Sequence, residues 1–77
     1  MDYVVSGWLR RGCSVKLLSQ AYSPQVGPRA ARQTLWRWVA MQPGLLERLR
    51  GAGWQKGQHL LTPLQVRLIV DALGEPG

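Results

Sequence analysis

Cysteine and histidine are almost missing from this 77-residue chain, which has one of each, Cys13 and His59. A single cysteine excludes an intrachain disulfide, and a small domain without disulfides is typical of the reducing cytosol. One cysteine and one histidine cannot supply the four protein ligands of a structural zinc site. We therefore expect a cytoplasmic protein that carries neither a metal nor another cofactor.

Catalytic signatures are missing as well. His59 has no motif around it, and Glu47 and Asp71 are single carboxylates without a nearby partner in sequence for acid–base chemistry. Cys13 is interpreted as a small packed residue rather than a nucleophile. The chain also lacks a phosphate-binding glycine loop. We expect a binding protein rather than an enzyme.

Long apolar runs are absent too. None approaches the 18 or so residues of a membrane span, and the start of the chain lacks the basic region of a signal peptide. The length allows one domain, and 45% hydrophobic residues are enough for an ordered core. We expect a single domain over residues 1–77, with an ordered core at about 7–74 and tails at 1–6 and 75–77.

Acidic residues are scarce, because four Asp and Glu stand against ten Lys and Arg, which gives a net charge of +6 and a pI near 10.8. No acidic residue occurs between Asp2 and Glu47. Eight of the ten cations are arginines, which can hold a phosphate or a guanine through two parallel hydrogen bonds. This balance favours an anionic partner, most simply nucleic acid.

Glycine and proline divide the chain into short elements. Thr62 and Gln65 have the spacing of a capping box at the start of the last helix. Two lone strands are not stable singly, so we expect them to pair in an antiparallel ribbon. The predicted fold class is mainly α, with four short helices and a two-stranded β ribbon. The predicted elements are a strand at 7–12, helices at 15–22, 29–41, 43–50 and 62–73, and a strand at 59–61.

Apolar residues recur at helical spacing in each predicted helix. Ser14 caps the first helix in this interpretation, and Pro43 begins the third. The expected core residues are Leu17, Leu18, Ala21, Tyr22, Ala31, Leu35, Trp38, Val39, Leu45, Leu46, Leu49, Val66, Ile69, Val70 and Leu73.

The helix at 29–41 is basic on the side away from its apolar face. Trp36 lies about 100° from the centre of that apolar face. It either seals the edge of the core or contacts nucleic acid or a second subunit. The polar face holds Arg29, Gln33 and Arg37, with Arg32 on the flank.

Helices 15–22 and 29–41 have the proportions of a helix-turn-helix, although their connection of about six residues exceeds the usual three or four. The second helix of that motif enters the major groove with its N-terminal residues leading. The loop at 54–58 lies beside the predicted ribbon. In one interpretation it acts as a wing that touches phosphate or the minor groove, and in the other it is a connector whose Lys56 is solvated. The candidate major-groove residues are Arg29, Arg32, Gln33, Trp36 and Arg37, and the candidate phosphate contacts are Arg10, Arg11, Lys16 and Lys56.

Three other interpretations remain open. In the first interpretation, the basic helix is a surface helix whose arginines are solvated. In the second, the chain is a helical protein-interaction module, whose leucines at 45, 46 and 49 form an exposed patch together with Trp36. RNA replaces duplex DNA in the third. A single small module buries little DNA surface, so we also expect a homodimer or a larger protein partner.

Several blocks of the sequence, 18–24, 35–39, 43–49, 53–54, 61–69 and 73–76, together resemble a family of short uncharacterised bacterial proteins, a domain of unknown function. More loosely, residues 17–39 are similar to the start of excisionase-type and MerR-type winged helix-turn-helix domains. Residues 34–38 (Thr-Leu-Trp-Arg-Trp) match the recognition helix of those domains. That similarity implies a small DNA-binding protein or transcriptional regulator. The chain departs from it in its longer turn and its extra leucine-rich helix.

Overall fold

The computed structural model describes residues 3–76, and the side chains from Gly7 onward. Helices dominate, and the short strands form one antiparallel ribbon, so the predicted mainly α class is confirmed. The described residues form five helices rather than four. The elements in chain order are α1 (Tyr3–Arg11), β1 (Cys13–Ser14), α2 (Val15–Tyr22), α3 (Pro28–Met41), α4 (Leu45–Gly51), β2 (Leu60–Leu61) and α5 (Pro63–Leu73).

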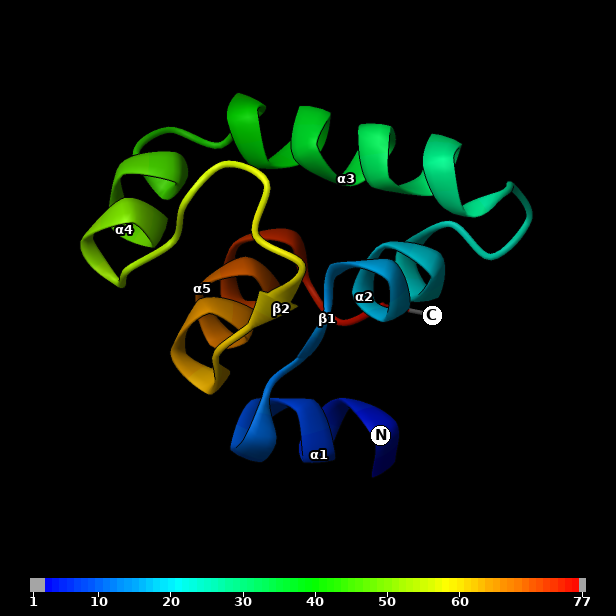
Figure 1. The fold of residues 1–77 in the computed structure, drawn as a ribbon, viewed down its shortest axis with the longest axis horizontal. Helices are drawn as coiled ribbons and strands as arrows, with labels where there is room; N and C mark the ends of the chain where they lie inside the picture. The colour runs from blue at the N-terminus through cyan, green and yellow to red at the C-terminus, as the bar shows by residue number, and fades with distance from the viewer. Residues whose placement is uncertain (1–2, 77) are drawn as a thin grey trace.

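The longest helix, α3, lies across one end of the molecule, and α1 lies at the opposite end (Figure 1). Between them are α2, α5 and the ribbon. Helix α2 packs along α3, while α5 contacts α1, α3 and α4. The core therefore runs through the centre of the molecule. Its buried hydrophobic cluster consists of Val15, Leu18, Leu35, Val39, Leu45, Leu49, Leu61, Val66, Ile69 and Val70.

The prediction of a strand at residues 7–12 is wrong, because α1 covers this segment as far as Arg11. The prediction treated Gly7 as a boundary, but a glycine inside a helix costs only about 1 kcal/mol relative to alanine. Packing compensates for that cost, since α1 lies against α5 and places Trp8 and Leu9 on the core. Tertiary contact decides the conformation here.

Two predicted core residues, Leu17 and Trp38, are exposed, and four others, Ala21, Tyr22, Leu46 and Leu73, are half-buried. Leu17 is 54% exposed, and Val15 and Ser19 are buried instead. Val15 lies beside the ribbon, where its N–H donates to the His59 carbonyl at 2.8 Å. Trp38 is 38% exposed, since Ala31, Leu35 and Val39 fill the core face of α3. Its ring meets Tyr22 edge-on, with the centroids 6.2 Å apart.

Helix α4 begins at Leu45 and not at the predicted Pro43. Gly44 precedes it in a left-handed conformation with φ of 75°, which ends the connection from α3. Leu45 and Leu49 are fully buried, and Leu46 is half-buried at the edge of the core. The leucines at 45, 46 and 49 therefore belong mainly to the core.

The ribbon pairs a segment near the start of the chain with a segment near its end. Cys13 pairs with Leu61, and Ser14 pairs with Leu60. Gly12 leads into the ribbon with φ of +82°, and its N–H donates to the Trp8 carbonyl at the end of α1. Two short strands provide few ladder hydrogen bonds, so the packing around the ribbon must hold it.

The predicted capping box at the start of α5 is confirmed. The Thr62 hydroxyl accepts a hydrogen bond from the Gln65 N–H at 3.2 Å, and the Gln65 side-chain oxygen accepts one from the Thr62 N–H at 3.0 Å. Gln65 does more than cap the helix, because its side chain is buried and its amide donates to the Ala52 carbonyl at 3.1 Å. One side chain thus joins the start of α5 to the end of α4.

Replacing Thr62 with alanine is expected to lower the free energy of unfolding by about 1 kcal/mol, because the hydroxyl then no longer caps the Gln65 N–H. Urea denaturation followed by circular dichroism measures the loss. Thr62→Ser keeps the hydroxyl and is expected to retain most of the stability. Equal midpoints for Thr62→Ala and the parent chain would show that the cap does not contribute.

Candidate nucleic-acid interface

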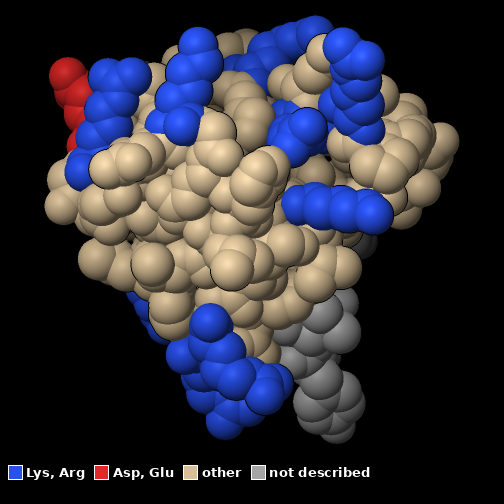
Figure 2. Space-filling view, in the orientation of Figure 1, with Lys and Arg blue, Asp and Glu red and all other residues tan. Residues whose placement is uncertain are grey.

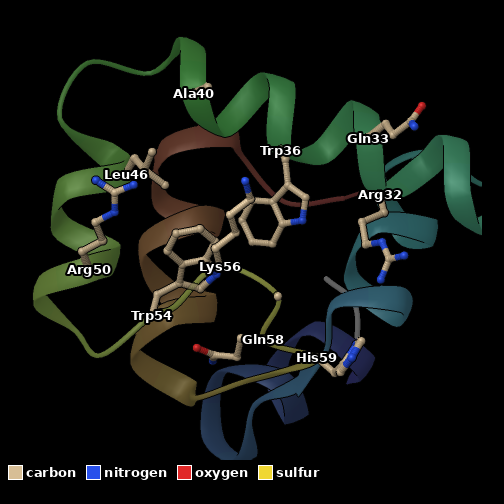
Figure 3. A pocket seen from close by; sticks show the side chains of 11 residues that line it. Arg32, Gln33, Trp36, Ala40, Leu46, Arg50, Trp54, Lys56, Gln58 and His59 are labelled. Atoms are coloured by element: carbon tan, nitrogen blue, oxygen red, sulfur yellow. The ribbon is translucent and has the colours of Figure 1, made fainter.

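One flank of α3 carries Arg29, Arg32, Gln33, Trp36 and Ala40, which recur at steps of three and four residues. Four of these five side chains line a groove between α3, α4 and the loop at residues 52–59 (Figure 3). We call it the α3 groove. It has a volume of about 730 Å³. Its lining residues are Arg32, Gln33, Trp36, Ala40, Leu46, Arg50, Trp54, Lys56, Gly57, Gln58 and His59.

A pair of tryptophans forms the apolar floor of the α3 groove. The rings of Trp36 and Trp54 lie 5.3 Å apart between centroids, tilted by 49°. Both side chains are half-buried and pack against the core cluster. Trp36 therefore seals the edge of the core and also lines the groove. The Nε1 atom of Trp54 is buried and makes no hydrogen bond within the described part of the chain, so packing alone positions this ring.

Cations from three different elements surround this floor. Arg32 comes from α3, Arg50 from α4 and Lys56 from the 52–59 loop, and all three side chains are exposed. In Figure 3, Arg32 and Arg50 lie on opposite sides of the tryptophan pair, and Lys56 crosses in front of it. The residues that line the groove include no Asp or Glu. The groove thus combines an aromatic floor with a positively charged rim.

Arg50 was missed by the sequence prediction. Its position becomes evident only when α4 folds back beside α3, and the chain turns there at Gly44. Arg50 is a basic residue in the last turn of a short helix, and this local pattern does not reveal that the chain reverses direction at Gly44. Only the tertiary arrangement assigns Arg50 to the groove.

A second hollow, of about 490 Å³, adjoins the start of α3. It brings Lys16 of α2 together with Arg29 and Arg32 of α3, and Arg32 lines both hollows. No side chain caps this end of α3, because the N-cap residue is Gly27. The predicted contacts Lys16, Arg29 and Arg32 therefore form one basic cluster.

Other predicted site residues lie elsewhere. Arg37 is exposed on α3 but lines neither hollow. It follows Trp36 directly, and one residue along an α-helix rotates the side chain by about 100°, away from the groove. Arg10 and Arg11 belong to α1, at the opposite end of the molecule from α3. In Figure 2, cations gather over α3 and α4, and a separate group lies over α1. The structure thus divides the predicted set between two ends of the molecule.

The 52–59 loop is held in place by glutamines. The Gln58 amide donates to the side-chain oxygen of buried Gln65 at 2.7 Å, and the Gln58 side-chain oxygen accepts from the Gln55 N–H at 3.0 Å. Because Gln65 also binds the Ala52 carbonyl, both ends of the loop are connected to α5. Lys56 is therefore presented to the groove by an anchored loop.

Two titratable side chains elsewhere have raised pKa values. Burial raises the pKa of the Cys13 thiol to about 11, so the thiol is protonated at neutral pH and is not activated as a nucleophile. Burial, and then the nearby Glu75 carboxylate, raises the pKa of Tyr22 to about 12. The Tyr22 hydroxyl donates to the Gly74 carbonyl and so connects α2 to the end of α5. Both groups lie outside the α3 groove.

The fold and the groove define a small helical domain with a basic, aromatic-floored face. A family model described as Domain of unknown function (DUF4248) matches residues 11–76. The chain belongs to this family, which confirms the first of the two resemblances. No curated protein and no solved structure matches the chain. Among the described residues, no helix is both long and apolar enough to span a bilayer.

Proposed function

We propose that this protein binds double-stranded DNA, with α3 in the major groove and the 52–59 loop as a wing. One observation carries the proposal. Cations from α2, α3, α4 and the loop lie along one flank of α3, and the residues that line its two hollows include no acid. Such a concentration of one charge sign favours a polyanion. The protein would then belong to the small regulators or excisionase-like proteins of the winged helix-turn-helix kind.

The outward side of α3 has a shape that suits a DNA groove. Ala30, Gln33, Arg37 and Ala40 are all exposed and follow one another along the helix, and we call this row the outer ridge. The alanines are short, so base edges can come close to the helix axis. The major groove admits an α-helix, and Gln and Arg pair with adenine and guanine there. Gln33 and Arg37 would read bases, while the cluster of Lys16, Arg29 and Arg32 would hold phosphates.

A salt titration of duplex affinity tests this proposal. If Lys16, Arg29, Arg32 and Lys56 neutralise about four phosphates, log K falls against log salt with a slope near −3.6, at about −0.9 per phosphate. Lys56→Ala is expected to flatten that slope by about one unit and to weaken all sequences equally. Gln33→Ala is expected to change sequence preference, at about 1–3 kcal/mol for a lost bidentate contact. Fluorescence anisotropy of labelled duplexes measures both quantities.

Arg67 supplies the matched control for this experiment. It is exposed on α5 and lines neither hollow. Arg37→Glu and Arg67→Glu change the net charge equally, yet only the first removes a cation from α3. A much larger loss for Arg37→Glu is expected. Equal losses would mean that binding follows net charge alone, and no duplex binding at low salt would overturn the proposal.

The alternative is a protein-interaction module without nucleic-acid binding. That interpretation needs the leucines at 45, 46 and 49 to form an exposed apolar patch with Trp36. Leu45 and Leu49 are fully buried, whereas Leu46 and Trp36 are half-buried. This burial supports the DNA proposal over the interaction module.

A further inference from the structure

We propose that the α3 groove binds an unpaired nucleobase, stacked on Trp36, with its flanking phosphates held by Arg32 and Arg50. This proposal goes beyond duplex binding, because the bases of a duplex are stacked on each other and are not available to a protein ring. It rests on the tryptophan pair and on the groove, whereas duplex binding rests on the cation distribution along α3. The expected ligand is therefore single-stranded nucleic acid, or a duplex with a melted or extruded base.

The size of the groove suits a small part of a nucleic-acid strand. Ligand pockets in proteins commonly have volumes of about 300–1,000 Å³, and the α3 groove has about 730 Å³. Its apolar surface is limited to Trp36, Trp54, Leu46 and Ala40. A groove of this kind accommodates a flat ring with polar edges.

The two indoles provide a stacking surface. Their 49° tilt and 5.3 Å separation leave the rings neither parallel nor fully covered by each other, and both side chains keep exposed surface. Bases stack on aromatic side chains with little regard to sequence, because every base has a π face. The Nε1 atom of Trp54 is itself buried, so a base would contact the exposed ring surface of the indoles and not this donor. A base supplies the flat face that such a surface binds.

The charges flank the aromatic floor on both sides. Arg32 on α3 and Arg50 on α4 lie on opposite sides of the tryptophan pair in Figure 3. A strand that crosses the groove puts one base over the indoles and carries a phosphate toward each arginine. Lys56 adds a third cation over the same floor. The groove thus presents an arginine, an aromatic surface and a second arginine in sequence, which matches the order of phosphate, base and phosphate along a strand.

An acidic amphipathic peptide is the competing occupant. Helical peptides are bound through apolar anchors at positions i, i+3, i+4 and i+7, which need a row of apolar sockets along the groove. The α3 groove has one aromatic floor, with Leu46 and Ala40 beside it, and the other lining residues are polar, charged or glycine. The observations therefore favour a nucleobase.

The test compares two oligomers with equal phosphates. Labelled octathymidylate and an abasic octamer of the same backbone are titrated with the full chain, and anisotropy gives each Kd. Because the phosphates are equal, the ratio of the two Kd values isolates the base. One stacked base contributes about 5- to 150-fold in affinity, which corresponds to about 1–3 kcal/mol. We expect octathymidylate to bind more tightly by a factor in this range.

Trp36→Leu and Trp38→Leu form a matched pair of variants. Trp36 lines the groove, and Trp38 lies two positions further along the same helix, against Tyr22 and outside the groove. Trp36→Leu is expected to bring the Kd ratio close to one, while Trp38→Leu keeps the parent ratio. Equal ratios for the two variants, or a parent ratio near one, would overturn the proposal.

Two further measurements complete the design. NMR of the unmodified chain follows the indole N–H signals of Trp36 and Trp54, which are expected to shift with octathymidylate and not with the abasic octamer. This readout decides the question even if Trp36→Leu fails to fold.

An acidic Glu/Leu helical peptide that shifts these signals while octathymidylate does not would assign the groove to a protein partner. Duplex affinity is measured separately with Arg37→Glu, so failure of one proposal leaves the other standing.

Discussion

Gly12→Ala is expected to prevent the ribbon from closing and to cost about 2–5 kcal/mol of the free energy of unfolding. Gly12 has φ of +82°, and a Cβ atom there would lie 2.1 Å from the Leu61 carbonyl oxygen. A left-handed conformation costs a non-glycine residue about 1–2 kcal/mol, and overpacking adds about 1–3 kcal/mol. The crowded atoms belong to the backbone of Leu61 and Thr62, so no side-chain rotation relieves the contact. A small domain with a stability near 5 kcal/mol would lose much of its folded population.

Gly53→Ala separates the two causes of that loss. Gly53 has φ of +90°, but a Cβ atom added there meets nothing within 4 Å. Only the cost of the left-handed conformation applies, so we expect a loss of about 1–2 kcal/mol. Urea denaturation of both variants, followed by circular dichroism, measures the difference. Similar midpoints for Gly12→Ala and Gly53→Ala would mean that the close approach of Gly12 to β2 does not exist in solution.

Ile69→Ala is expected to lower stability by about 2–5 kcal/mol, the usual cost of truncating a buried aliphatic side chain. Ile69 is fully buried in the cluster that α5 shares with α2, α3 and α4. Each kcal/mol shifts the melting temperature of a domain of this size by about 4–8 °C. We therefore expect the Tm to fall by at least about 8 °C in a calorimetric or circular dichroism melt.

Leu64→Ala is the control on the same helix. Leu64 is 54% exposed, so its truncation leaves no internal cavity. Surface substitutions of this kind usually change stability by no more than about 0.5 kcal/mol. An unchanged Tm for Ile69→Ala, or equal shifts for the two variants, would mean that Ile69 does not lie in the core.

The elements that sequence analysis predicted well are those with explicit local signals. Helix α5 has Thr62 and Gln65 as a capping box and Gly74 at its end, so its bounds follow from neighbouring residues. Helix α1 lacks such signals, because Gly7 interrupts its pattern and its contacts with α5 are distant in sequence. Local chemistry determines the first case, and tertiary packing determines the second.

The candidate site divides in the same way. The helical period of α3 placed Arg29, Gln33 and Arg37 on the polar face, with Arg32 and Trp36 on the flank, which needs only the geometry of a single helix. Trp54 and Arg50 join that flank through the turn before α4 and the return of the chain toward β2. Arg10 and Arg11 could not be placed, because the orientation of α1 depends on α5. Sequence analysis gives the face of a helix, whereas the opposing wall of the groove requires the fold.

The ribbon pairs residues that lie far apart in the chain, Cys13 with Leu61 and Ser14 with Leu60. Helices α2 and α3 are neighbours in sequence, so their contact closes a short loop, while the ribbon must close a long one. During synthesis, the α2–α3 corner can dock soon after it leaves the ribosome, but β1 has no partner until β2 emerges. Until then the cationic surface of α3 is already displayed, while the core cluster still lacks Val66, Ile69 and Val70 of α5. The nascent chain therefore carries its charge before its core is complete, and mutual repulsion between such chains opposes their aggregation.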